Sequence, residues 1–185
     1  MLINICYFIL DGMLMTTEAG AYKMATFSDE HMNRLFEKFV LEYYRVHHKE
    51  LAASPDHIQW NITDPDDAVI DFLPSMKTDI TLHKGDRTLI IDTKYYGRMM
   101  QEQFDKQTIH SGNLYQVFTY IKNLDKCNTG LVSGMLLYAK TQESIAPDLD
   151  AHFGPNRIMV RTLDLNQEFD GIRKHLDGFA ETIEQ

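Results

Sequence analysis

The stretch TDITLHKGDRTLIIDTKYY, residues 78–96, predicts a β-hairpin around which the rest of the chain is arranged. Residues 79–83 and 88–95 are rich in β-branched and long apolar side chains, which favour strands. The four residues between them, KGDR, are typical of a tight turn. A turn centred on Gly85-Asp86 predicts the following pairs: 84 with 87, 83 with 88, 81 with 90, and 79 with 92.

The hairpin is expected to have two different faces, because successive side chains of a strand point in opposite directions. One face collects Ile80, Leu82, Leu89 and Ile91. The other collects Asp79, Thr81, His83, Thr88, Ile90, Asp92 and Lys94. We therefore expect one face to pack against a core and the other to carry a cluster of charge.

The expected pairing of Asp79 with Asp92 needs compensation, because like charges placed opposite each other in a ladder are destabilising. A divalent cation such as Mg²⁺, which prefers oxygen ligands and keeps several waters, would be held by two such carboxylates. Lys94 would point into the same pocket and place positive charge near a reacting phosphate. The alternative is a solvated hairpin face on which Lys94 neutralises an aspartate.

Length and composition indicate one soluble globular domain, with 185 residues, 44% hydrophobic and 24% charged. The two cysteines, Cys6 and Cys127, argue against a disulfide scaffold or a structural zinc site and favour a reducing, cytoplasmic setting. The apolar run LINICYFIL at residues 2–10 is short and has no basic flank. It therefore predicts a core helix rather than a signal peptide or a membrane span.

The formal net charge of −9 argues against a protein that coats nucleic acid by charge alone. Its distribution is uneven, because the segment from Lys77 to Lys106 has six basic residues against five acidic ones. The hairpin is therefore relatively positive, which is consistent with brief phosphate contact while another subunit holds the DNA. A merely solvated charged face is the alternative.

The helix expected at 29–48 begins after Ser28 and has an apolar stripe at three- and four-residue spacing. Glu37 lies at the margin of this stripe, where it would reach a neighbouring cleft if the helix packs beside the hairpin. A second helix is expected at 113–124, with Gln116 and Tyr120 one turn apart. That pair could bind a phosphate, a base or a catalytic water, or simply give polar cover to the helix.

The remaining pattern completes an α/β fold with a mixed sheet flanked by helices. Strands are expected at 131–139 and 158–165, joined by a connection at 141–157. The other expected elements are a helix at 1–14, a loop at 15–27, a loop at 50–70 with a short strand at 57–62, a loop at 98–112 and a helix at 167–184.

Glu37, Asp79, Asp92-Thr93-Lys94 and Gln116-x-x-x-Tyr120, in this order, resemble the motifs of the PD-(D/E)xK nuclease superfamily in its RecB-like arrangement. Longer strings, MNRLFEKFV, LPSMKTDITL, LIIDTKYY and SGNLYQVFTYI, resemble the C-terminal nuclease half of the McrC family. That family supplies the cleaving subunit of the modified-cytosine restriction system. The resemblance runs from about residue 4 to residue 180 and implies a restriction-endonuclease-like fold.

The resemblance implies roles for individual residues. Asp79, Asp92 and Glu37 would bind Mg²⁺, with Mn²⁺ as a substitute, and Lys94 would be the catalytic lysine. Gln116 and Tyr120 would contact the substrate. Two departures from the family pattern, Thr78 in place of proline and aspartate as the acid of the D/E-x-K triplet, remove no ligand.

The resemblance also implies a domain organisation and partners. We expect one nuclease domain over 1–185, with an N-terminal helix and loop at 1–27 and a catalytic core at 28–185. The family's N-terminal region, which engages a GTP-hydrolysing AAA+ ring of the McrB type, is expected to be absent. The expected function is Mg²⁺-dependent cleavage of DNA containing modified cytosine, and no membrane partner is expected. The alternative is a non-catalytic subunit that docks on the ring and stimulates its GTPase.

Overall fold

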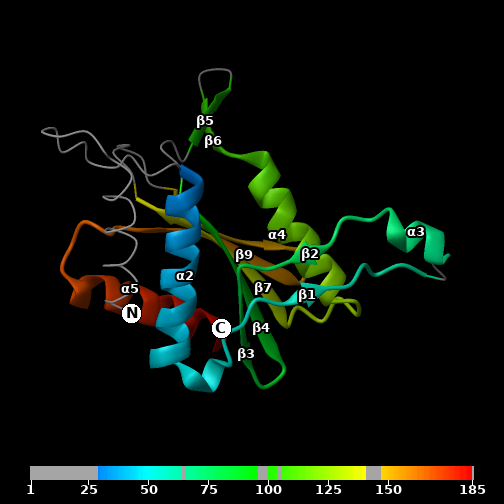
Figure 1. The fold of residues 1–185 in the computed structure, drawn as a ribbon, viewed down its shortest axis with the longest axis horizontal. Helices are drawn as coiled ribbons and strands as arrows, with labels where there is room; N and C mark the ends of the chain where they lie inside the picture. The colour runs from blue at the N-terminus through cyan, green and yellow to red at the C-terminus, as the bar shows by residue number, and fades with distance from the viewer. Residues whose placement is uncertain (1–28, 64–65, 96–99, 104–105, 141–146, 185) are drawn as a thin grey trace, which may run out of the picture.

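The protein is an α/β sandwich built on a five-stranded mixed sheet (Figure 1). The computed structural model describes residues 29–63, 66–95, 100–103, 106–140 and 147–184. The strand order is β3-β4-β7-β9-β8, with bounds β3 Ile80–Lys84, β4 Arg87–Lys94, β7 Val132–Ala139, β8 Leu149–Phe153 and β9 Asn156–Leu163. The central strands β4, β7 and β9 are parallel, and each edge strand is antiparallel to its neighbour. The expected fold class is confirmed.

The β3–β4 hairpin forms in the expected register. Its turn contains Gly85 with a φ of 60°, a left-handed conformation that glycine adopts at little cost. The pairs 84 with 87, 83 with 88 and 81 with 90 are confirmed, but the ladder ends at Ile80 opposite Ile91. Asp79 therefore lies just before β3 and is not a ladder partner of Asp92, contrary to the expectation.

Both faces of the sheet are buried, and each belongs to a different core. Helices α2 (Asp29–His47) and α5 (Phe169–Glu181) cover the face formed by Ile80, Leu82, Leu89 and Ile91. Helix α4 (Ser111–Leu124) covers the other face, where Val117 and Ile121 pack with Ile90 and Leu136. The expected cluster of charge lies on this second face, where Lys94 pairs with Asp92, but α4 and its apolar side chains bury much of the face, which was not expected.

One glycine allows α4 to lie close to the sheet. A Cβ atom built on Gly134 of β7 would collide with the side chains of Val117 and Ile121. The helix consequently packs directly over β7 and beside β4. This close packing is what encloses Asp92 at the end of β4.

Several short elements lie where loops were expected. The expected loop 50–70 overlaps η1 (Lys49–Leu51) and contains α3 (Asp67–Asp71). The short strand expected at 57–62 is confirmed in part by β1 (His57–Ile58), which pairs with β2 (Met76–Lys77). A hairpin of β5 (Met100–Gln103) and β6 (Lys106–Ile109) lies in the expected loop 98–112. Strand β8 lies in the expected connection 141–157, and the final helix ends in η2 (Thr182–Glu184).

The expected helix at 1–14, the loop at 15–27 and the cap Ser28 lie outside the described residues. Within the described ranges, none of the helices is sufficiently long and apolar to cross a bilayer.

Candidate functional site

The candidate site lies at the carboxyl end of β4, beneath α4. Asp92 is fully buried there, and the ammonium of Lys94 lies 2.6 Å from its Oδ2 atom. Because the two residues are separated by one position in a strand, their side chains share a face. Apart from this ion pair, neither carboxylate oxygen of Asp92 accepts a hydrogen bond from any described residue. A buried carboxylate is thus left with one cationic neighbour and unused acceptor capacity.

Asp79 approaches the same strand from the start of β3. Its Oδ2 atom accepts hydrogen bonds from the backbone N–H of Thr93 at 2.7 Å and from the Thr93 hydroxyl at 2.9 Å. Asp79 is therefore fixed to the middle residue of the Asp92-Thr93-Lys94 triplet. The expected closeness of the two aspartates arises from this contact rather than from a ladder pair.

The environment of Asp92 raises its pKa well above the ordinary value of an aspartate. Burial, opposed by the nearby charge of Lys94, raises the pKa of Asp92 to about 7. The negative charges of Asp79 and Glu37 raise the pKa of Asp92 further. Additional positive charge beside Asp92 would consequently favour its ionised form beyond what Lys94 alone achieves.

Helix α2 packs beside the hairpin and brings Glu37 to the site. One turn before Glu37, the Asn33 side chain accepts a hydrogen bond from the backbone N–H of Tyr95 at 2.8 Å. This contact joins α2 to the residue that follows Lys94. Burial raises the pKa of Glu37, as does the charge of Asp79, while Lys94 acts in the opposite direction. The condition set for Glu37, that its helix lies next to the hairpin, is met.

Gln116 and Tyr120 of α4 form a hydrogen-bonded chain that begins at Lys94. The Lys94 ammonium donates to Gln116 Oε1 at 3.4 Å, and Gln116 Nε2 donates to the Tyr120 hydroxyl at 2.8 Å. The Tyr120 hydroxyl in turn donates to the backbone carbonyl of Lys77 at 3.0 Å. In this arrangement the two residues hold Lys94 in place, and the substrate contacts expected for them remain a prediction.

The donor set fits a hydrated Mg²⁺ ion. Apart from the ion pair with Lys94, both carboxylate oxygens of Asp92 lack a hydrogen-bond partner among the described residues. The charges of Asp79 and Glu37 also reach Asp92. Carboxylate oxygens are the hard ligands that Mg²⁺ prefers. In the ranges that the structure describes, however, no three His, Cys, Asp or Glu side chains are gathered into a ready-made metal cage. The residues therefore suit a cation that keeps several waters, rather than one enclosed by protein ligands.

Some residues of the site were not singled out in the sequence. Thr93 stands in the Asp92-Thr93-Lys94 triplet, but its hydrogen bonds to Asp79 and the contact of Asn33 with the backbone of Tyr95 were not foreseen. The Thr78 hydroxyl accepts a hydrogen bond from the Asp56 backbone N–H at 2.8 Å and thereby fixes the residue before Asp79. A partial signal existed for Asn33, because it lies four residues before Glu37 and thus on the same face of the helix.

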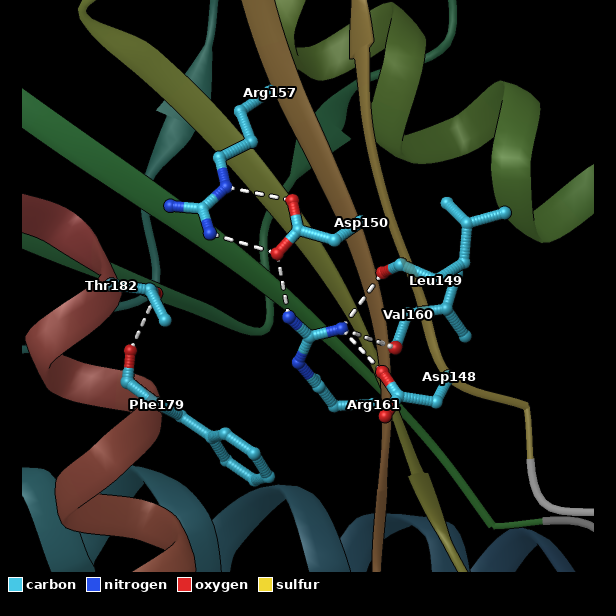
Figure 2. Close-up of polar contacts among 8 residues, drawn as sticks. All are labelled: Asp148, Leu149, Asp150, Arg157, Val160, Arg161, Phe179 and Thr182. Atoms are coloured by element: carbon cyan, nitrogen blue, oxygen red, sulfur yellow. Dashed lines mark hydrogen bonds and ion pairs between the residues drawn. The ribbon is translucent and has the colours of Figure 1, made fainter. Parts of the chain in front are cut away.

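A second charged cluster lies on β8 and β9 and differs from the candidate site (Figure 2). Asp150 accepts two hydrogen bonds from Arg157, both at 2.8 Å, and a third from Arg161 at 2.7 Å. These contacts lower the pKa of Asp150 to about 2, with the Arg157 hydrogen bonds as the largest cause. Asp148 pairs with Arg161 at 2.6 Å. This cluster compensates its own charges and offers no open coordination position.

Comparison with known proteins gives two findings. The family model described as "McrBC 5-methylcytosine restriction system component" matches residues 1–139, a range that contains all six candidate residues. Over 184 residues, the chain is 27% identical to the Type IV methyl-directed restriction enzyme EcoKMcrBC of Escherichia coli (strain K12). The alignment covers 98% of this chain and 52% of that relative, so the chain spans about half the length of the curated protein it matches.

Proposed function

Because the chain belongs to the family of McrBC 5-methylcytosine restriction system components, we propose that it is the Mg²⁺-dependent endonuclease subunit of such a system. It would hydrolyse phosphodiester bonds in DNA that contains modified cytosine. The observation that carries this proposal is the buried and incompletely compensated Asp92 carboxylate, with Lys94 beside it and Asp79 and Glu37 acting on it.

Each residue of the site has a role that follows from its surroundings. Asp92, Asp79 and Glu37 would hold the Mg²⁺ ion, which when bound supplies positive charge to polarise a phosphoryl oxygen and acidify water. Lys94, held between Asp92 and Gln116, would stabilise the negative charge that develops on the phosphate. Glu37, with its raised pKa, is suited to accept a proton from the attacking water.

The partners follow from the family and from charge. A chain with a net charge of −9 has little general attraction for DNA, so a second subunit would recognise the modified base and hold the duplex. We propose that this subunit is a McrB-like AAA+ GTPase ring. The present chain would then supply the cleaving site to an assembly that selects the DNA.

The direct test is cleavage of a plasmid that contains modified cytosine, in the presence of Mg²⁺ and the cognate GTPase. The Asp92→Ala protein is expected to lose cleavage, while the wild type nicks or linearises the plasmid. Asp86→Ala is the matched control, because Asp86 is an exposed aspartate in the turn at the opposite end of β4. Equal cleavage by the wild type and by Asp92→Ala would eliminate the proposal.

A second candidate is a non-catalytic subunit that docks on the GTPase ring and stimulates it. The specific observation in its favour is that the described residues form no three-ligand metal cluster, while one oxygen of Asp79 is already engaged by Thr93. Calorimetric titration with Mn²⁺ separates the two candidates. The nuclease should bind Mn²⁺ in a manner that Asp92→Ala abolishes, whereas a docking subunit should show no such binding.

A further inference from the structure

An apolar projection stands away from the body of the protein. Helix α3 lies at the tip of an excursion between β1 and β2, well separated from the sheet (Figure 1). We refer to Asp66–Leu73 as the α3 arm. Phe72 in this arm is 90% exposed, the highest value among the exposed large hydrophobic residues of the described chain, and Val69 and Ile70 are 48% and 46% exposed.

Hydrogen bonds link the residues of the α3 arm to one another and close its base. Within it, the N–H groups of Val69 and Phe72 donate to the carbonyls of Asp66 and Val69 at 2.8 and 3.3 Å. At its base, the Trp60 indole donates to the Pro74 carbonyl at 2.8 Å, which ties the two sides of the excursion together. The backbone thus holds three large apolar side chains in water. Exposed apolar groups clustered on one element mark an interaction site more often than scattered ones do.

Charge identifies the kind of partner that fits the arm. From Gln59 to Met76 the sequence has four aspartates and no lysine, arginine or histidine. Phosphate would be repelled, so the arm does not suit DNA. A second copy of this chain, with its net charge of −9, is also disfavoured. The arm complements a protein surface with an apolar pocket bordered by lysine or arginine.

We propose that the α3 arm is a docking element that inserts Phe72 into an apolar, basic-rimmed pocket of a partner protein. This inference rests on the proposed function, under which the partner is the GTPase subunit of the restriction system. Large aromatic anchors at the centre of a pocket carry much of the energy of protein interfaces. Phe72 supplies the anchor, and the exposed Asp66 and Asp71 supply orientation and salt-dependent attraction.

The arm is connected directly to the candidate active site. Its C-terminal side continues into β2, and Asp79 follows β2 after one intervening residue, Thr78. The carbonyl of Lys77 in β2 is the group to which the Tyr120 hydroxyl donates. A partner that holds the α3 arm therefore holds the segment that positions both Asp79 and the Lys94–Gln116–Tyr120 chain.

The test is a binding titration between the full chain and a purified McrB-like AAA+ GTPase of the same restriction system, at two salt concentrations. Phe72→Ser is expected to weaken binding by at least about 30-fold, which corresponds to loss of an interface anchor. Phe72→Leu should retain most of the affinity because it keeps an apolar side chain. Val46→Ser on α2 is the matched control, since Val46 is another exposed apolar residue, at 57%, and should bind like the wild type. Higher salt should weaken the wild-type complex.

Three outcomes would overturn the docking proposal. The first is that Phe72→Ser binds the GTPase as tightly as the wild type. The second is that Val46→Ser loses as much affinity as Phe72→Ser. The third is that the wild type does not bind the GTPase. Asp92→Ala separates this proposal from the nuclease function, because it should bind the GTPase normally and yet fail to cleave DNA. If Asp92→Ala still cleaves, the nuclease function is lost. If Asp92→Ala fails to cleave but Phe72→Ser binds the GTPase as tightly as the wild type, the docking inference is lost and the nuclease function stands.

Discussion

Two clusters of acidic and basic side chains lie on the same sheet and behave in opposite ways. On β8 and β9, Asp150 receives three hydrogen bonds from two arginines, and its pKa falls to about 2. On β4, Asp92 has Lys94 as its close cationic partner, and burial raises its pKa to about 7. Both clusters combine carboxylates with cations, so residue type alone does not distinguish them.

The difference lies in how completely each carboxylate is compensated. A guanidinium group can donate paired hydrogen bonds to a carboxylate, so the arginines of the β8–β9 cluster compensate its aspartates without a ligand or a metal. The β4 cluster places a carboxylate in a dry environment with too little positive charge. Such strongly shifted groups are concentrated at functional sites, where a ligand or metal supplies what is missing. The contrast supports the proposal that the β4 cluster, rather than the β8–β9 cluster, is the functional site.

The largest expected effect is on the cleavage rate when Lys94, rather than Arg161, loses its charge. Lys94→Met should lower the cleavage rate by about 10²–10³-fold, because a charge that stabilises the transition state is removed. Arg161→Met should cleave within about twofold of the wild type at equal concentrations of folded protein, because Arg161 belongs to the self-compensated cluster. Initial rates of plasmid cleavage measure both. Similar losses in the two variants would break the distinction between the clusters.

The next effect is on stability and its dependence on pH. Unfolded Asp92 releases its proton near pH 4, whereas the folded protein retains it to about pH 7. Between these values the folded state binds more protons, so the free energy of unfolding falls as the pH rises. Asp92→Asn avoids this cost and should exceed the wild type by up to roughly 4 kcal/mol at pH 8.

Urea denaturation in a chelating buffer at pH 4, 6 and 8 measures the difference. The advantage of Asp92→Asn should shrink steadily towards pH 4. A difference that does not vary with pH would show that Asp92 is ionised normally in the folded protein.

Metal binding should offset part of the stability that the folded protein loses when Asp92 is ionised. Mg²⁺ at a hundredfold excess over its Kd should stabilise the wild type by about 2.7 kcal/mol. Asp92→Asn should gain nothing, whereas Asp150→Asn should gain as much as the wild type. Thermal unfolding with and without Mg²⁺ is the measurement. A metal response in Asp92→Asn would place the cation elsewhere.

The smallest effect is expected in the compensated cluster. Asp150→Asn should lower the free energy of unfolding by no more than about 1 kcal/mol at pH 7, because the ion pairs are partly solvated. Since the pKa of Asp150 is depressed, this contribution is present above about pH 4 and is lost as the pH falls towards 2. Acid denaturation of the variant and the wild type should therefore converge at low pH.

The sequence predicted the parts of the fold that depend on local patterning. The turn residues around Gly85 established the β3–β4 register, and the alternation of Ile80 and Leu82 identified the face that meets α2 and α5. The second buried face was missed because it is created by a distant helix. The β5–β6 hairpin was missed because its sequence, MQEQ and KQTI, lacks a continuous apolar face.

The members of the candidate site were named from the sequence and their roles stay a prediction, whereas their contacts were not foreseen. The structure joins Asp92, Lys94, Gln116 and Tyr120 through direct contacts. Asp79 and Glu37 lie close enough for their charges to raise the pKa of Asp92. The Asp79–Thr93 and Asn33–Tyr95 hydrogen bonds were not foreseen, because one partner in each is a backbone group. Strand β8 was interpreted as a connection because Pro147, Asp148 and Asp150 obscure its short alternation.

The hairpin turn between β3 and β4 is also a suitable attachment point for a probe. A Cβ atom added at Gly85 would meet no other atom within 4 Å, and Gly85 lies at the far end of β4 from Lys94, roughly 25 Å along the strand. A fluorophore attached at position 86, whose side chain is exposed, would extend into solvent and leave the length of the turn unchanged. It would report on assembly and DNA capture without entering the site where cutting is proposed to occur.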